Sequence, residues 1–418
     1  MSPLKKIGTN LAYKTTTELI GRVLAFIFYM MIARWLGEVA FGTFSLVYSV
    51  LAVLVFLVDP GLNLLLIRQG SRDSNFIDSA LGGMLGLKVT LSFLMTTIAL
   101  VYAVLGGFET TVIWIFFLLG IQMAGFAITE YASAIFQSQE KMQYETMIMG
   151  ASKIAVTGLA SLCLALGAGL LFAVAVMTLV QSVAAICSLS FTFRQGYTSI
   201  LPSFAVPQWA NLLRQAFPLA AITFFVIAFY RIDIAIAPFL GMGLAEIGWY
   251  SSGVKLLDVA LAVPTLGMAA AFPTLSRLAA QDRSRFLRLS NLLLLAIALS
   301  GLTCALLVFF FAKNIVLTIF GAGFVPAVSS TSLLGIASFF VFTRHGLLTL
   351  MILDGKSDSA VKIVAIGLAV NITCNLMLIP TNGAIGAAWS KVITDLSVCI
   401  AGSWVWFSIV RRGVKLDE

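Results

Sequence analysis

The sequence predicts an all-α integral membrane protein with about twelve transmembrane helices. Of its 418 residues, 60% are hydrophobic and only 11% are charged, whereas about 25% of the residues of a soluble domain are charged. The mean hydropathy is +1.03. Long apolar stretches follow one another along the whole chain, and their continuity argues against a transmembrane barrel, whose strands alternate apolar and polar residues over about ten positions.

Twelve apolar stretches have the length of tilted membrane-spanning helices, which need roughly 20 residues each. The first six are expected at residues 11–33, 41–65, 79–104, 112–136, 147–167 and 170–193. The other six are expected at residues 213–239, 247–273, 289–311, 326–352, 359–380 and 384–409. Short glycine-rich segments such as Gly106-Gly107 separate several of them and indicate tight turns between neighbouring helices.

The distribution of lysine and arginine predicts the orientation. With the N-terminus in the cytoplasm, sixteen basic residues fall on the inner side and only two, Arg34 and Lys313, on the outer side. Positive charges prefer the cytoplasmic side, so we expect an even number of spans with both termini in the cytoplasm. The net charge of +8 is then mostly an orientation signal, and nucleic acid is not an expected partner.

The chain is expected to form two six-helix lobes. Its longest central break, residues 196–212, contains two prolines and a tryptophan, so we expect an N-terminal lobe at 1–195, a cytoplasmic linker at 196–212 and a C-terminal lobe at 213–418. Leu36-Gly37 followed by Phe41-Gly42 recurs as Leu240-Gly241 followed by Ile247-Gly248. Six spans followed by six in the same orientation are typical of a parallel duplication.

The residues of metal-dependent or triad-based catalysis are scarce. His345 is the only histidine, and the five cysteines fall within expected spans without a C-x-x-C pair, which argues against a zinc site or a histidine triad. Gly355-Lys356-Ser357 resembles the end of a phosphate-binding loop, but Leu350 stands where that loop needs glycine. We therefore expect no enzyme activity, metal or cofactor, and any active transport would use an ion gradient, the membrane potential or the substrate's own gradient.

Eight basic and six acidic residues lie within the expected spans, apart from Arg214 and Lys362, which stand at the ends of their spans and are counted with the cytoplasmic residues. A charge at the bilayer centre costs at least about 2.5–3.5 kcal/mol, so these residues must pair or line a water-filled cavity. Glu18 and Arg22 are four apart and share one face of the first helix. Arg231 and Asp233 are two apart, cannot face each other, and need partners elsewhere.

Other charged residues can pair within their own helices. Lys255 and Asp258 are three apart, and Lys391 and Asp395 are four apart. A purely structural ion network of the seventh and eighth helices, joining Lys255 and Asp258 to the two charges of the seventh, is an open alternative to a binding role. Lys88 and Arg344 have no acidic residue at pairing distance on their own helices, which favours a cavity with surplus positive charge.

A series of short motifs runs along the chain. They are Arg34-Trp35-Leu36-Gly37, Phe41-Gly42-Thr43-Phe44-Ser45, Asp59-Pro60-Gly61-Leu62, Gly248-Trp249-Tyr250-Ser251 and Pro273-Thr274-Leu275-Ser276-Arg277. In this order they resemble the polysaccharide-export branch of the multidrug/oligosaccharidyl-lipid/polysaccharide (MOP) exporter superfamily, which includes Wzx-type O-antigen or repeat-unit flippases. The resemblance covers essentially the whole chain and implies two six-helix lobes in a V around a central cavity, in the cell inner membrane.

The resemblance implies a flippase that moves a polyprenyl-pyrophosphate-linked oligosaccharide across the cytoplasmic membrane by alternating access, for O-antigen, capsule or exopolysaccharide synthesis. Arginine and lysine in a cavity would bind the pyrophosphate. The expected head-group contacts are Arg22, Arg231, Lys255 and Lys391, with Lys88 and Arg344 in reserve. Residues that would balance these charges or carry a coupling H⁺ or Na⁺ are Glu18, Asp233, Asp258 and Asp395. Membrane lipids and a polysaccharide polymerase are the other expected partners.

Three alternatives stay open at this stage. An ion-coupled multidrug or metabolite exporter of the same superfamily often carries cations and would call for a net acidic cavity, whereas basic residues are in excess within the spans. A membrane glycosyl transferase or polymerase would need a large outer loop or an exposed carboxylate cluster, and the sequence contains neither. A non-transporting scaffold would have to accommodate mid-depth charges on at least four helices.

Overall fold

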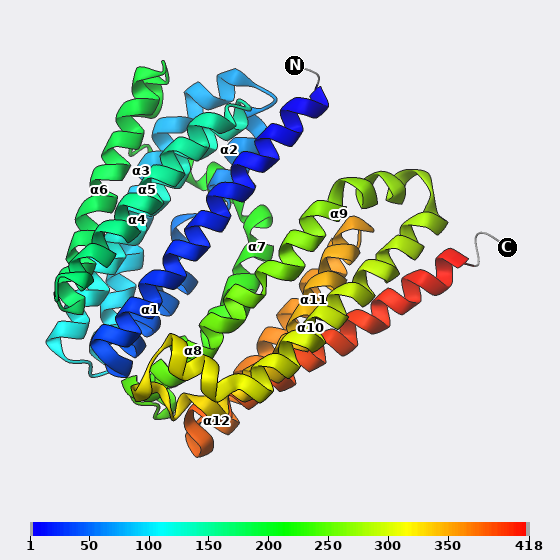
Figure 1. The fold of residues 1–418 in the computed structure, drawn as a ribbon. Helices are drawn as coiled ribbons and strands as arrows, with labels where there is room; N and C mark the ends of the chain where they lie inside the picture. The colour runs from blue at the N-terminus through cyan, green and yellow to red at the C-terminus, as the bar shows by residue number, and fades with distance from the viewer. Residues whose placement is uncertain (1–2, 415–418) are drawn as a thin grey trace. The chain divides into compact units, whose positions relative to one another are not determined.

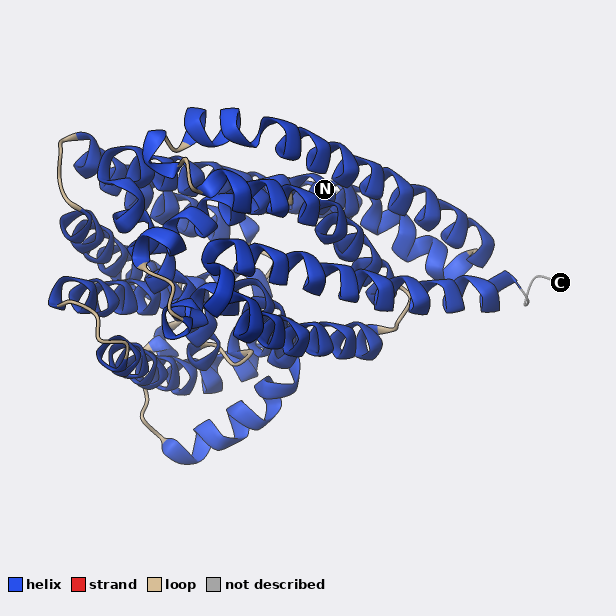
Figure 2. Ribbon diagram, turned by 90° about the horizontal axis from the view of Figure 1, so that it is seen from below, coloured by secondary structure: helices blue, strands red, loops and turns tan. Residues whose placement is uncertain are grey.

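The computed structural model describes the backbone of residues 3–414, and the side chains of residues 21–411 apart from 74, 75, 78, 207 and 218–223. Within these residues the chain consists of helices joined by short loops, with no strand (Figure 2). The predicted all-α membrane fold is confirmed.

In the described part of the first half of the chain, helices follow one another with short connections (Figure 1). They are α1 (Pro3–Val58), α2 (Leu62–Gly70), α3 (Ser74–Leu105), α4 (Thr110–Ser138), α5 (Met142–Ala165), α6 (Leu170–Arg194) and η1 (Thr198–Ile200). The 56-residue α1 consists of two helices joined at Gly37, whose φ of 81° is not helical. The first two expected spans therefore lie within α1.

The second expected span ends earlier than predicted. It reaches Val58 and not residue 65, because Pro60 has no backbone N–H to continue the helix and Gly61 adopts a left-handed φ of 92°. The chain then starts the separate nine-residue helix α2. Asp59 consequently lies in the break between two helices, where its side chain can turn toward α3.

The second half also consists of helices (Figure 1). They are α7 (Val206–Ile236), η2 (Ala237–Leu240), α8 (Leu244–Ala260), α9 (Ala262–Gln281), α10 (Arg283–Ile319), η3 (Ala322–Phe324), α11 (Ala327–Leu353) and α12 (Ser357–Val414). The eighth expected span is divided at Leu261 into α8 and α9. Two helices join within α12 at Gly383, which has a φ of 51°.

Nine segments of the described chain are long and apolar enough to cross a membrane. Two of them, Gly21–Val58 and Ser357–Arg411, contain the joints at Gly37 and Gly383 and are 38 and 55 residues long. A straight helix of 38 residues would be about 57 Å long at 1.5 Å per residue, well beyond the roughly 30 Å of a bilayer core. Each of these two segments therefore supplies two spans.

Contacts divide the chain into two units. One comprises Met1–Leu36 and Leu46–Ile227, and the other comprises Gly37–Ser45 and Ala228–Glu418. The division within the second half of the chain falls inside α7, and nine residues of α1 belong to the second unit. The expected lobes at 1–195 and 213–418, with a linker at 196–212, do not have the boundaries of these two units. The division into lobes stays a prediction.

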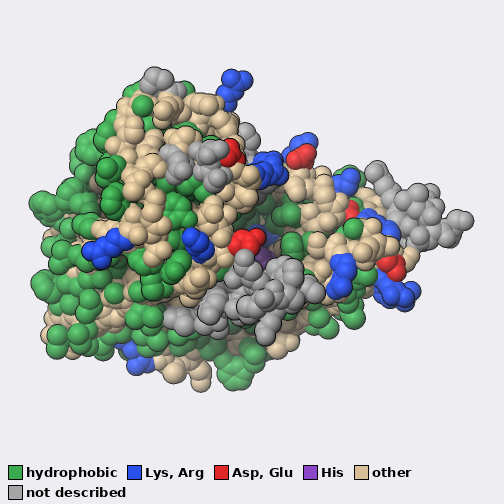
Figure 3. Space-filling model, turned by 90° about the horizontal axis from the view of Figure 1, so that it is seen from above, with side chains coloured by type: hydrophobic (Ala, Val, Ile, Leu, Met, Phe, Trp, Pro, Cys, Tyr) green, Lys and Arg blue, Asp and Glu red, His purple; other side chains and the backbone are tan. Residues whose placement is uncertain are grey.

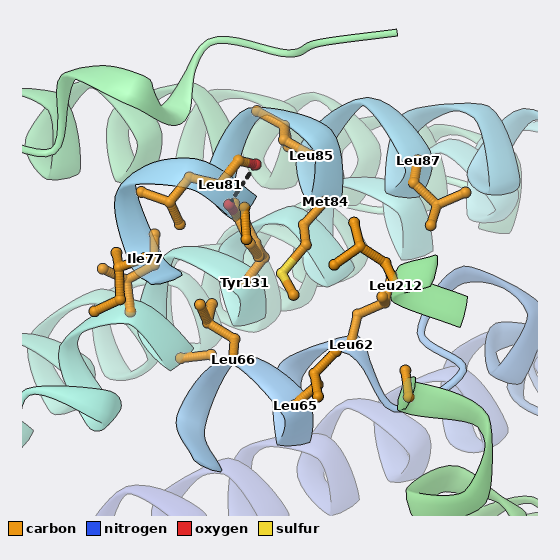
Figure 4. Packing of buried hydrophobic residues seen from close by; sticks show 14 of the residues in the cluster. Leu62, Leu65, Leu66, Ile77, Leu81, Met84, Leu85, Leu87, Tyr131 and Leu212 are labelled. Atoms are coloured by element: carbon orange, nitrogen blue, oxygen red, sulfur yellow. Dashed lines mark hydrogen bonds between the residues drawn. The ribbon is translucent and has the colours of Figure 1, made fainter. Parts of the chain in front are cut away.

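The core of the first unit is built around α2, α3 and α4 (Figure 4). Leu62, Leu65 and Leu66 place one face of α2 in this core, and the Tyr131 hydroxyl of α4 donates a hydrogen bond of 2.8 Å to the Leu81 carbonyl of α3. Since a buried hydroxyl without a partner is costly, this bond lets an aromatic ring fill the core without an unsatisfied polar atom.

The linker also packs against α3 in the first unit. The backbone N–H of Ser203 donates to the Gly82 carbonyl over 2.8 Å, and a Cβ at Gly82 would lie 2.6 Å from the Leu201 carbonyl oxygen. A Cβ at Gly86 would clash with the Ser203 carbonyl. The G-x-x-x-G of α3 thus provides room for the backbone of residues 201–203.

In the second unit, the glycines that recur in the two halves of the sequence meet each other. A Cβ on Gly42 would clash with the Leu244 carbonyl oxygen and lie 2.8 Å from the Gly248 nitrogen. A Cβ on Gly248 would in turn clash with the Glu38 carbonyl. The two helices can approach this closely only because neither residue has a side chain.

Candidate functional site

Seven of the ten candidate residues gather in the second unit, on α7, α8, α11 and α12. They are Arg231, Asp233, Lys255, Asp258, Arg344, Lys391 and Asp395. Basic side chains also lie at the surface, as the face drawn in Figure 3 shows. Lys255, Arg344 and Lys391 differ from those because they are buried.

One carboxylate is shared by two cations of α7 and α8. An Asp258 oxygen lies 3.0 Å from Nη2 of Arg231 and 3.6 Å from Nζ of Lys255. The predicted pairing of Lys255 with Asp258 within α8 is therefore present, and Asp258 supplies the partner that Arg231 lacks on its own helix. Lys255 is 7% exposed, whereas the shared Asp258 side chain is 30% exposed, so the group lies at the border between the protein interior and more open surroundings.

A second carboxylate is shared in the same way between α11 and α12. One oxygen of Asp395 lies 2.9 Å from Nε of Arg344, and the other lies 3.8 Å from Nζ of Lys391. Asp395 is fully buried. Phe229 of α7 adds cation–π contacts, with its ring centre 4.7 Å from Cζ of Arg344 and 4.8 Å from Nζ of Lys391. Tyr230 accepts a hydrogen bond of 3.0 Å from Arg344.

Asp233 is held by hydrogen bonds. The Tyr250 hydroxyl donates to one of its oxygens over 2.5 Å, and the backbone N–H of Ile234 donates to the other over 2.8 Å. Arg231, two residues earlier on α7, pairs with Asp258, as expected for side chains that point in different directions. The ion network expected between α7 and α8 therefore joins three of its four residues, and Tyr250 binds the fourth.

Lys88 and Arg344, the two cations that were expected to be unpaired, both have carboxylate partners. Lys88 was expected to lack one, but its Nζ lies 3.4 Å from a carboxylate oxygen of Asp59. Arg344 was expected to lack one and is paired with Asp395. The expectation was wrong because spacing along one helix reveals only partners on that helix, and both carboxylates come from other segments.

The remaining candidates lie in the first unit. Arg22 has an exposed side chain on α1, and Lys153 of α5 packs against the neighbouring Gly21, with its Cδ 2.9 Å from the position of a Cβ on that residue. Lys88 is fully buried on α3. The side chain of Glu18 lies outside the described residues, so its expected pairing with Arg22 stays a prediction.

Neutral polar residues near the second-unit charges were missed from the sequence. Asn375 donates to the Asn371 side chain over 2.9 Å, and Ser390 donates to the Asn371 carbonyl over 3.3 Å. All three are fully buried. The sequence contains a pattern that could have indicated them: two asparagines four residues apart in an apolar span share one helix face and need polar partners there.

The second unit thus concentrates charge within its helices. Four cations, Arg231, Lys255, Arg344 and Lys391, accompany three carboxylates, which leaves one positive charge in excess. Each ion-paired carboxylate serves two cations, and Lys391 donates no hydrogen bond to any described group. Such an arrangement can accept an additional anion. Among the described residues, no group of three or more His, Cys, Asp or Glu could hold a metal ion.

Several solved structures have a similar fold. The chain is similar to a structure described as "Lipid II flippase MurJ, inward closed conformation", with a TM-score of 0.74, 10% identity and coverage of 96% of this chain and 90% of that one. It is also similar to inward- and outward-facing multidrug resistance MATE family transporters of the MOP superfamily. Their TM-scores are 0.72 and 0.62, both are 13% identical, and coverage is 95% of both chains for the first and 98% and 96% for the second. These similarities show that the chain shares the fold of these proteins, and its apolar helices indicate a multi-pass inner-membrane protein.

The family follows from the sequence match. Residues 7–279 match the family model Polysacc_synt, described as "Polysaccharide biosynthesis protein", and the chain belongs to this family. The predicted membership of the MOP superfamily is confirmed. A search of curated proteins gave no significant match.

Proposed function

We propose that the protein is a flippase that carries a polyprenyl-pyrophosphate-linked oligosaccharide across the inner membrane by alternating access. The observation that carries this proposal is the pair of shared carboxylates in the second unit, where four cations accompany three acidic groups. Membership of a polysaccharide biosynthesis family and a fold similar to that of a lipid II flippase support the same substrate class.

The pyrophosphate would compete with Asp258 and Asp395 for their cations. A guanidinium presents a rigid fork of donors that matches phosphate oxygens, and an ammonium adds a compact charge. Because each carboxylate already serves two cations, one of each pair can turn to the substrate while the other keeps the carboxylate neutralised. Lys255 and Lys391 are 7% and 3% exposed, so head-group binding requires the surrounding helices to open.

The lipid part of the substrate would stay among membrane lipids while the head group crosses. An ion gradient of H⁺ or Na⁺ is the proposed energy source, and a polysaccharide polymerase is the proposed consumer of the product. No covalent step is required, because the lipid-linked sugar leaves chemically unchanged.

Neutral lysine replacements test the proposal. In cells lacking their own copy of the gene, Lys255→Met and Lys391→Met should abolish surface polysaccharide while the protein remains inserted at normal abundance, because methionine keeps the side-chain length without the charge. Lys313→Met, at an exposed position on α10, is the matched control and should export normally. Normal export by both variants would refute the assigned site.

An ion-coupled multidrug or metabolite exporter is the alternative, and the similarity to MATE transporter structures supports it. The surplus positive charge in the second unit disfavours a cationic drug, because like charges repel strongly in a medium of low dielectric constant. Drug accumulation in the same cells separates the two functions. Drug resistance that depends on Lys255, with polysaccharide export unchanged, would favour the exporter.

A further inference from the structure

A long apolar groove lies between α5 and α6 of the first unit, two helices that stand side by side (Figure 1). Its volume is about 600 Å³, within the roughly 300–1,000 Å³ of small-molecule binding sites. The groove shares no residue with the charged cluster of the second unit. Among the described residues that line it, only Arg194 carries a charge.

Small side chains at helical spacing form this groove. Ala151 and Ala155 are four apart on α5, and Ala184 lies opposite them on α6. Because these side chains are short, they leave a space between the two helices. The lining positions of α6 recur at spacings of three and four from Val180 to Arg194, so the groove follows one face of this helix.

Hydrogen bonds hold the helices together behind the groove. Ser152 of α5 lines the groove and donates to Oε1 of Gln181 over 3.0 Å, and Nε2 of Gln181 donates to Oγ1 of Thr129 on α4 over 3.0 Å. All three residues are buried. The groove is therefore already formed before a ligand binds, which lowers the cost of binding.

The groove opens toward membrane lipid. Val183 lines it and is 51% exposed. Leu179, Ile186 and Phe193 lie on the same side of α6, and all three are exposed. Large apolar side chains exposed along one helix face contact hydrocarbon and not water, because their contact with water is unfavourable.

The length of the groove matches one leaflet of a bilayer. The 25 residues of α6 extend about 38 Å at 1.5 Å per residue, which exceeds the roughly 30 Å of the hydrocarbon core. Arg194, the last residue of α6, therefore reaches the level of the lipid head groups. From Val180 to Arg194 the lining extends about 21 Å, more than the roughly 15 Å of one leaflet.

Positive charge and aromatic rings gather at the Arg194 end of the groove. The ring of Phe191, one turn before Arg194, lies 5.4 Å from the ring of Tyr144 near the start of α5. Lys141 directly precedes α5, and its Nζ lies 5.8 Å from the ring centre of Tyr197. Tyrosine rings and basic side chains are typical of the head-group level of membrane proteins.

Arg194 is available for an anionic ligand. Its side chain is exposed and forms no ion pair or hydrogen bond with another described side chain. The acidic residues nearest to this end in sequence, Glu140 and Glu145, do not line the groove, and both have interactions of their own. Glu145 lines a separate pocket toward α4.

We propose that this groove binds one anionic phospholipid. The guanidinium of Arg194 holds the phosphate through paired hydrogen bonds, Lys141 adds positive charge at the same end, and one acyl chain lies along the groove. A zwitterionic phospholipid carries a cation next to its phosphate, which the two basic side chains disfavour. Lipid binding at this groove does not rest on the proposed function.

Native mass spectrometry of the purified full-length protein tests the head-group contact. From an equal mixture of phosphatidylglycerol and phosphatidylcholine with the same acyl chains, the wild type should retain one phosphatidylglycerol. Arg194→Gln should bind this lipid at least about tenfold more weakly, because a hydrogen bond between charged groups is lost. Arg288→Gln, at an exposed position of α10 outside the groove, is the matched control and should bind as the wild type does.

A second variant tests the seat of the acyl chain. Ala151 is exposed on α5, so Ala151→Phe fills the groove without placing a larger side chain in the core. This variant should lose the bound phosphatidylglycerol although Arg194 is intact. Ile154→Phe, exposed on α5 outside the groove, is its control and should retain the lipid. Glycerol phosphate, which has the head group without acyl chains, should not displace the lipid from the wild type.

Thermal unfolding provides an independent readout. The unfolding temperature should be higher in micelles with phosphatidylglycerol than in micelles with phosphatidylcholine for the wild type, Arg288→Gln and Ile154→Phe, because a ligand stabilises only the state that binds it. For Arg194→Gln and Ala151→Phe the two temperatures should be equal.

Four results would overturn the phospholipid site. They are equal retention of the two lipids by the wild type, undiminished binding by Arg194→Gln, preferential retention of a polyprenyl phosphate over phosphatidylglycerol, and a wild-type dimer that Ala151→Phe dissociates. The last result would make the groove an interface between two copies of the chain. Retention of phosphatidylglycerol together with normal export in Lys255→Met and Lys391→Met would support the lipid site and refute the head-group site alone.

Discussion

The close crossing of Gly42 and Gly248 makes a single methyl group a severe perturbation. A Cβ on residue 42 would lie 2.8 Å from the Gly248 nitrogen, about 0.6 Å closer than the 3.4 Å at which ordinary contacts begin, and the Leu244 carbonyl oxygen is nearer still. All of these atoms are backbone, so no rotamer change can relieve the clash and the two helices must separate. We expect Gly42→Ala to destabilise the protein by about 1–3 kcal/mol, toward the upper end of the range for overpacking.

Thermal unfolding of the purified protein measures this effect. Gly158→Ala is the matched control, because Gly158 lies within α5 and a Cβ there would meet nothing within 4 Å. Alanine is favoured over glycine in a helix by up to about 1 kcal/mol, so this control should be as stable as the wild type or slightly more stable. If Gly42→Ala unfolded at the wild-type temperature, the crossing would not be as tight as the structure has it.

Two further predictions concern the charges and the linker. Asp395→Asn should destabilise the protein by about 3–5 kcal/mol, because it leaves Arg344 and Lys391 buried without a counter-charge. Thermal unfolding measures this effect. The control Asp282→Asn, which removes the charge of an exposed ion pair, should change the stability by no more than about 1 kcal/mol. Gly86→Ala should displace the segment at Ser203 and speed its cleavage by an added protease, whereas unchanged cleavage would show that the segment does not depend on this contact.

Local rules predicted the parts of the charged cluster that lie on one helix. The spacing of Lys255 and Asp258, and of Lys391 and Asp395, was enough to predict ion pairs that the structure contains. The partner of Lys88 was missed because Asp59 stands in a break between helices, where helix periodicity says nothing about direction.

The fold class and the approximate spans followed from hydropathy, because a bilayer demands long continuous apolar helices. Their interruptions were harder to predict. The joints at Gly37 and Gly383 fall between expected spans, whereas the breaks at Pro60 and Leu261 interrupt stretches that were expected to be continuous.

The placement of Gly37–Ser45 within the second unit affects how the protein is made. Phe41 packs edge-on against Phe320 and Phe324, residues that the ribosome adds about 280 positions later. At about 5–20 residues per second, an emerging chain would wait roughly 14–56 s before this segment meets its permanent neighbours. The backbone of α8 that faces Gly42 is made earlier, about 200 residues after it, so this segment gains its neighbours one after another and is fully packed only late in translation.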